Sequence, residues 1–154
     1  MKNEVTHDIL KFILGGKATF AIVQDRSDKS DGGIAWYHVN VSKDGKTFFV
    51  SGLGAGNSKL YQGYWKASDL ASGNVALRVG SKQPQGNVDC KPLLWVVNKL
   101  LNGGDDALPS VVHVVSDAKC SCCGRTLTDL NSTGRGIGPD CYKKLQGRLG
   151  VWGL

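Results

Sequence analysis

The residues best suited to chemistry are cysteines, four of which lie within 22 residues near the C-terminus. Cys120 and Cys123 form a C-x2-C pair, a spacing at which two thiolates can reach one metal ion at about 2.3 Å. Gly124 follows the pair and suits the positive φ that such a turn often needs. Pro139 predicts a helix start, which puts Cys141 in a first turn, where the helix dipole favours a thiolate. A C-x2-C turn, a small β excursion and a ligand at a helix N-terminus are typical of a treble-clef-like zinc module.

A structural zinc site needs a fourth ligand, and the sequence leaves its identity open. The candidates are His113, Cys122, Cys90 and Asp140. Cys122 and Asp140 each adjoin another ligand, so they rarely face the same ion, and Cys90 stands at the head of a separate predicted helix. His113 lies in an apolar run that leads into the first cysteine pair. We therefore expect a structural, not catalytic, Zn(II) held by Cys120, Cys123, Cys141 and His113, with an ordinary strand histidine as the alternative for His113.

The cysteine segment also carries a longer pattern, Cys120-x2-Cys123-Gly-Arg-x-Leu-Thr-Asp-x-x-Ser132-x3-Gly136-Ile-Gly-Pro139-x-Cys141. It resembles a motif common in small phage- and plasmid-encoded zinc-binding proteins of unassigned function, and similar motifs are appended to helicase-like mobile-element proteins. Weaker similarity covers most of the chain. Three departures stand out: Leu130-Asn131 replaces a usual Pro-Glu, Cys122 is an extra thiol, and six residues separate His113 from the first cysteine. The resemblance implies a mobile-element origin and a zinc module, and it brings no enzymatic activity.

Length and composition favour one α+β domain with a small appended module. The chain has 154 residues, of which 41% are hydrophobic and 21 are glycines. We expect an α+β domain over residues 1–108 and a zinc-binding module over 109–154, packed on the domain or continuous with it. No apolar run of membrane-spanning length occurs, and the N-terminus does not read as a signal peptide. We therefore expect a cytoplasmic protein, in the host cell if phage-encoded, whose cysteines bind metal instead of forming disulfides.

Charge adds a second functional signal. The formal net charge is +6, and residues 117–154 hold six basic against three acidic side chains. A basic excess of this kind is expected of a surface that binds phosphates. The candidate nucleic-acid contacts in this segment are Arg125, Arg135, Lys143, Lys144 and Arg148. The alternative is that Arg125 braces the cysteine turn and that the lysines are merely solvated.

Hydrophobic patterns predict a mostly antiparallel sheet of five or six strands with two helices. Residues 6–14 and 92–102 read as the helices, the first capped by Thr6 or Asn3. The expected strands are residues 18–25, 34–43, 47–53, 60–66, 74–80 and 108–116. Asp44-Gly45 is the clearest hairpin turn. Asp105 and Asp106 are expected to be solvated in a glycine-rich loop.

Aromatic residues give the sheet a possible function of its own. Strand alternation sets Tyr37 on one face of the sheet and Trp36 on the other. An aromatic ring such as Trp36 on an open sheet face, with lysines nearby, could bind single-stranded nucleic acid, because rings stack on bases and lysines contact phosphates. A covering helix over Trp36 is the alternative. Tyr37 and Trp95 are expected in the core. No nucleophile elbow or H-E-x-x-H motif occurs, so we expect no enzymatic activity.

Two functions remain after these observations. The first is a nucleic-acid-binding accessory protein of a phage or other mobile element, contacting DNA or RNA through the zinc module. The second is an effector that binds a host protein, such as an inhibitor of an enzyme or defence system, with purely structural zinc. No membrane partner is expected.

Overall fold

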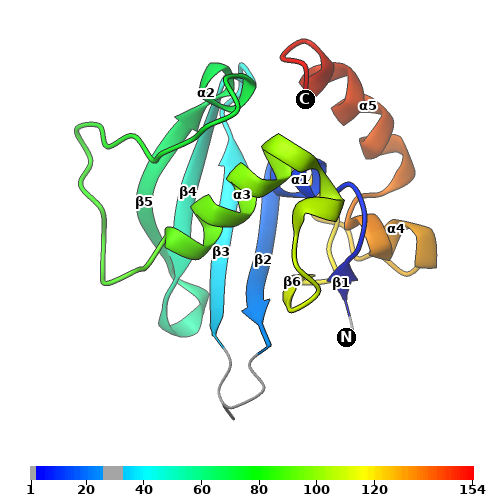
Figure 1. The fold of residues 1–154 in the computed structure, drawn as a ribbon, viewed down its shortest axis with the longest axis horizontal. Coiled ribbons are helices and arrows are strands. Elements are labelled where there is room, and N and C mark those ends of the chain that lie inside the picture. Colours follow the sequence, from blue (N-terminus) through cyan, green and yellow to red (C-terminus); the bar gives the residue numbers. More distant parts are fainter. Residues whose placement is uncertain (1–2, 26–32) are drawn as a thin grey trace.

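The computed structural model of the protein describes residues 3–25 and 33–154. One six-stranded antiparallel sheet, in the order β1-β6-β2-β3-β4-β5, forms its centre (Figure 1). The strands are β1 (Glu4–Val5), β2 (Lys17–Gln24), β3 (Ile34–Val41), β4 (Thr47–Leu53), β5 (Lys59–Lys66) and β6 (Val112–Ser116). The helices are α1 (Ile9–Ile13), α2 (Ala67–Ala71), α3 (Lys91–Gly103), α4 (Leu130–Arg135) and α5 (Pro139–Gly150), with 3-10 turns η1 (Ala55–Asn57) and η2 (Asp105–Ala107). The expected α+β class is confirmed.

The hairpin between β3 and β4 forms at the predicted turn. The Asp44 carboxylate accepts hydrogen bonds from the Ser42 hydroxyl at 2.6 Å and the Lys46 amide at 3.0 Å. Gly45 adopts φ 73°, a value that side-chain-bearing residues rarely tolerate. Local turn chemistry therefore sets the register of the two central strands.

The core lies between one face of the sheet and the helices α1 and α3, which pass in front of it in Figure 1. Phe20 of β2, Tyr37 of β3 and Trp65 of β5 are fully buried on this face. The ring of Phe12 in α1 meets the ring of Phe20 edge-on, with centroids 5.8 Å apart. Helix α3 contributes a buried stripe that follows the predicted spacing: Leu93, Val96, Val97 and Leu100.

The predicted strand over 74–80 is wrong, because other groups take up its backbone hydrogen bonds. The side chain of Asn98 in α3 accepts from the Val75 amide at 2.8 Å and donates to the Val75 carbonyl at 3.1 Å. Only Arg78 forms a β-bridge in this stretch, to Tyr64 at the edge of the sheet. The short elements β1, α2 and α4 were not predicted, since each is too brief to show a hydrophobic period.

Helix α1 begins later than expected and is capped from a distance. The Asp105 carboxylate accepts from the backbone amides of Asp8 at 2.8 Å and Ile9 at 3.0 Å, so neither Thr6 nor Asn3 is the cap. Asp105 is therefore not a solvated loop residue, whereas Asp106 is exposed.

The segment after residue 108 is closely joined to the rest of the chain. Its strand β6 lies between β1 and β2 within the sheet. The division into 1–108 and 109–154 stays a prediction. Within the described residues, no helix is long and apolar enough to cross a membrane.

Candidate metal centre

Three of the predicted ligands come together. The sulfur atoms of Cys120, Cys123 and Cys141 all lie within 4.8 Å of one another. In residues 3–25 and 33–154, no other trio of His, Cys, Asp or Glu ligand atoms gathers this closely. Cys120 is buried, Cys141 is half-buried and Cys123 is exposed, so the cluster reaches from the core to the surface.

A tight turn presents the first two thiols. The Cys120 amide donates to the Arg125 carbonyl at 2.8 Å, and the Gly124 amide donates to the Cys120 carbonyl at 2.9 Å. Lys119 and Thr126 form an antiparallel bridge beside the turn. Gly124 adopts φ 81°, as its place after the pair predicted.

The third thiol comes from the first turn of α5. Gly138 is the N-cap and Pro139 is the first helical residue, which confirms the predicted helix start. The Gly138 amide donates to the Cys120 sulfur at 3.3 Å, so the start of α5 and the C-x2-C turn are joined directly. An N–H···S bond of this kind stabilises a thiolate or a thiolate–metal bond.

The segment between the thiols differs from the expected β excursion. Helix α4 occupies it, and the Asp129 carboxylate caps that helix by accepting from the Ser132 amide at 3.2 Å. The helix ends at Arg135, and its C-cap Gly136 adopts φ 68°. The Gly136 backbone also lies so close to Phe12 that a Cβ would overlap the ring. Ile137 beside it is fully buried. The thiol segment is therefore packed into the main core.

The local environment shifts the pKa values of two of the thiols in opposite directions. Burial acts to raise the pKa of Cys120, but hydrogen bonds from the backbone of Gly138, Cys123 and Cys122 outweigh it, and the pKa is lowered overall. For Cys141, burial and then the neighbouring thiols raise the pKa to about 12. A bound cation would instead lower the pKa of Cys141, because coordination removes the thiol proton.

The cluster fits a soft divalent metal. Tetrahedral Zn–S bonds of about 2.3 Å would put two sulfurs about 3.8 Å apart, a separation that falls within the 4.8 Å over which the three sulfurs gather. Thiolate sulfur is a ligand preferred by zinc and other soft ions over magnesium or calcium. The three cysteines could therefore hold a metal ion.

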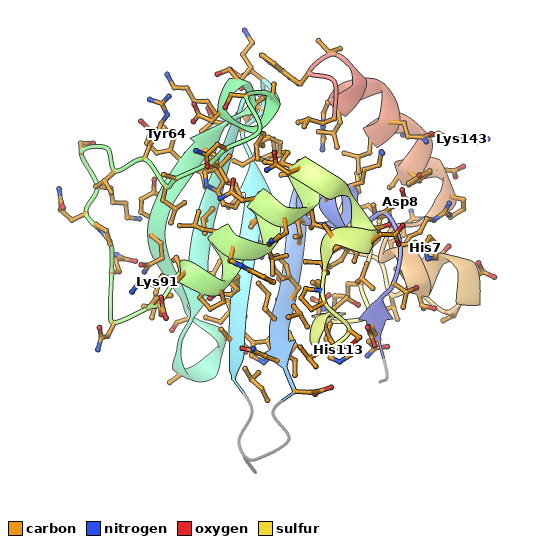
Figure 2. All side chains as sticks on the ribbon, in the orientation of Figure 1. His7, Asp8, Tyr64, Lys91, His113 and Lys143 are labelled. Atoms are coloured by element: carbon orange, nitrogen blue, oxygen red, sulfur yellow. The ribbon has the colours of Figure 1, made fainter. Side chains whose placement is uncertain are left out.

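The structure does not bring His113 to the thiols. One of its ring nitrogens (Nδ1) lies 2.9 Å from the Glu4 carboxylate, and the other (Nε2) lies 2.8 Å from the Asp25 carboxylate. Figure 2 shows it at the start of β6, whereas the thiols follow the end of that strand. The expected Cys3His set is thus corrected to three cysteines, since His113 links β1 and the end of β2 instead.

The remaining candidates for a fourth ligand also lie outside the trio of thiols. Cys122 is half-buried and packs against the hydrophobic core. Cys90 precedes α3, and burial, followed by the Asp89 charge, raises the pKa of its thiol. Asp140 is exposed in the first turn of α5.

The five predicted basic contacts divide into two groups. Arg125, Lys143 and Lys144 are exposed, and Figure 2 shows Lys143 extending outward from α5. Arg148 instead donates from Nη2 to the Leu14 carbonyl at 3.2 Å and the Gly15 carbonyl at 3.1 Å. Arg135 ends α4, and its guanidinium lies over the Tyr142 ring, 4.3 Å from the ring centroid. Both of these arginines are half-buried and bind other parts of the fold.

Two tryptophans are more exposed than core residues. Trp36 pairs with Ala21 on the face opposite to Tyr37 and is 40% exposed, so no described helix buries it. Trp95 was expected in the core, and its 42% exposure corrects that expectation. The signal was present in the sequence, because Trp95 falls outside the apolar stripe of its helix.

The comparisons with known proteins give one partial match. Residues 115–146 match a family of unknown function (DUF6011). The matched segment spans the end of β6, the three thiols and the first two thirds of α5. No curated protein and no solved structure matches the chain.

Proposed function

We propose that this chain is a small nucleic-acid-binding accessory protein of a phage or other mobile element, acting in the host cytoplasm as a binding protein and not as an enzyme. The observation that carries the proposal is the set of exposed cations beside the thiols: Arg125, Lys143 and Lys144. Arg125 comes two residues after Cys123, and Lys143 comes two residues after Cys141. Cations fixed beside a rigid turn suit contacts to phosphate oxygens.

The metal in this proposal is one structural Zn(II). Support comes from the three thiols, the N–H···S bond between Gly138 and Cys120, and the packing of Cys120 in the core. The metal would hold α5 against the C-x2-C turn and so fix the cations in place. The three cysteines would supply three of the four ligands of such a site.

Salt-dependent binding tests the proposal. Labelled single- and double-stranded DNA and RNA oligonucleotides are titrated with the metal-loaded protein across a salt series. Counterion release makes log Kd rise linearly with log salt concentration, and each lost phosphate contact lowers the slope by about one. A variant with Arg125, Lys143 and Lys144 replaced by Ala should bind more weakly, with a slope reduced by up to about three.

A charge-matched variant controls for net charge. Lys43, Lys59 and Lys82 are also exposed, and all three lie in the β3–β5 part of the chain or the loop that follows it. Their replacement by Ala removes three charges and should change binding less than the first variant does. The opposite order would place the interface on the sheet.

An effector that binds a host protein is the second candidate. The observation that favours it is Val151, which follows α5 and is 81% exposed. This function predicts negligible nucleic-acid affinity and a stoichiometric complex with a host protein that a Val151→Asp change weakens.

A further inference from the structure

An apolar cavity lies at the other end of the molecule from the thiols. It has a volume of about 850 Å³ and opens between the start of α3 and the ends of β2 and β3. Ile22, Ala35 and Val96 belong to its walls. Pockets for small ligands usually measure about 300–1,000 Å³ and have mainly apolar walls.

Several exposed apolar residues border this cavity. Among the described residues, six large hydrophobic residues are exposed, and four of them border the cavity: Ile34, Trp36, Trp95 and Val111. Ile34 and Trp36 alternate with Ala35 and Tyr37 along β3, so their side chains belong to the opposite face of that strand. Apolar surface left in water costs about 25 cal/mol per Å². Exposed apolar surface around one cavity therefore indicates a ligand that would cover this surface when bound.

The polar groups at the cavity suit a planar hydrogen-bonding edge. Gln24 and Asn87 line it, and both residues are exposed. An amide offers a donor and an acceptor side by side, which is the pattern that pairs with nucleobase edges. Lys91 also lines the cavity, is exposed, and lies at the start of α3 in Figure 2.

Trp95 offers a stacking surface. The ammonium group of Lys99, one helical turn later, lies over the indole at 5.6 Å from its centroid. Trp95 itself is 42% exposed, so part of its surface is open to a flat partner. Nucleobases stack on such rings with little regard to sequence.

We propose that this cavity binds a nucleobase, stacked on Trp95, hydrogen-bonded by Gln24 and Asn87, and with its phosphate near Lys91. The base belongs either to an unpaired strand or to a free nucleotide, since both present the same ring. For a strand, the proposal rests on the proposed nucleic-acid function; for a free nucleotide it does not. The turn that holds Cys120 and Cys123 contacts the first residue of β2, where the Lys17 amide donates to the Ser121 carbonyl at 2.6 Å. Eight residues of β2 separate the two sites, which amounts to roughly 23 Å.

The test uses the metal-loaded full chain with two probes, a labelled single-stranded 20-mer and the four ribonucleoside 5′-monophosphates. Trp95→Ala should weaken binding of the responding probe about 10-fold or more. The salt slope should stay unchanged, because no charge is removed. Trp95→Phe should recover most of the affinity, and Val151→Ala, an exposed apolar change outside the cavity, should have no effect. Asn87→Ala should weaken binding and change the preference among bases.

The outcomes separate the two proposals. A 20-mer whose affinity drops in the Arg125/Lys143/Lys144 variant but not in Trp95→Ala would overturn the cavity proposal and leave the proposed function standing. Monophosphates that bind and lose affinity in Trp95→Ala, with no binding of the 20-mer, would support a free nucleotide and overturn the proposed function. Failure of both probes to respond to Trp95→Ala, or occupation of the cavity by an apolar peptide alone, would overturn the cavity proposal.

Discussion

Arg148 of α5 donates a hydrogen bond to the main-chain carbonyl of Leu14, 3.2 Å away, at the C-terminal end of α1. A second bond reaches Gly15 at 3.1 Å. The last carbonyls of a helix have no partner within it, and a cation there also interacts favourably with the helix dipole. Arg148 therefore joins the thiol segment to the first helix of the chain.

Replacing Arg148 by Ala should destabilise the protein by roughly 2 kcal/mol, because half-buried carbonyls lose charged donors. Lys144→Ala, one turn earlier on an exposed position of the same helix, should change stability by less than about 0.5 kcal/mol. Urea unfolding of both variants measures the difference. Equal stability of the two variants would show that the Arg148 contacts contribute nothing.

Asp105 gives a second prediction, on α1. Asp105→Ala removes the acceptor for the Asp8 and Ile9 amides and should cost about 1 kcal/mol, as loss of a helix cap does. Asp106→Ala is the matched control, since its carboxylate is exposed in the same turn. Thermal unfolding compares them, and a larger loss in Asp106→Ala would contradict the capping role.

Stability should depend on pH through His113. Hydrogen bonding to Glu4, and then to Asp25, raises the pKa of His113 above its ordinary value, which is near 6.5. Because the folded state holds this proton more tightly, the stabilisation is complete below about pH 6.5 and is lost as pH rises through the folded pKa. The stability difference between wild type and His113→Gln should therefore shrink from pH 6 to pH 8, as measured by urea unfolding. A difference that grows over this range would refute the ion pairs.

His38 should act in the opposite direction. Burial, and then the charge of Lys59, lowers the pKa of His38 to about 4. The neutral ring is favoured in the folded state, so stability is lost as pH falls from about 6.5 toward 4. A His38→Gln variant should lack this part of the acid-induced loss.

Metal content tests the thiol centre. We expect one Zn(II) per chain by elemental analysis. Cys141→Ser should lower the zinc content and destabilise the fold, because metal binding contributes to folding free energy. Cys90→Ser, a thiol outside the cluster, should retain the metal. Purified wild-type protein that is fully folded without metal would rule out a structural zinc.

Local signals made much of the fold predictable. Strand alternation, the Asp44-Gly45 turn, the stripe of α3 and the Gly-Pro start of α5 each depend on neighbours within a few residues. The three cysteines were predictable for the same reason, since a C-x2-C pair and a helix start are short patterns. His113 failed as a ligand because its partners, Glu4 and Asp25, lie 109 and 88 residues away in the chain. Asp105 was expected to be solvated for the same reason, since its partners lie at the start of α1. The carbonyl partners of Arg148 lie just past the other end of that helix.

The contact between Gly136 and Phe12 has a consequence for how the chain would come apart. The backbone of the thiol segment lies directly on a core ring, and Cys120 belongs to the same buried cluster as Phe12. A chelator that removed the proposed zinc ion would then destabilise the centre of the molecule and not only its C-terminal end. Melting curves with and without chelator should each show a single transition, displaced in temperature. In a cell, the susceptibility of this chain to proteases would follow the supply of metal.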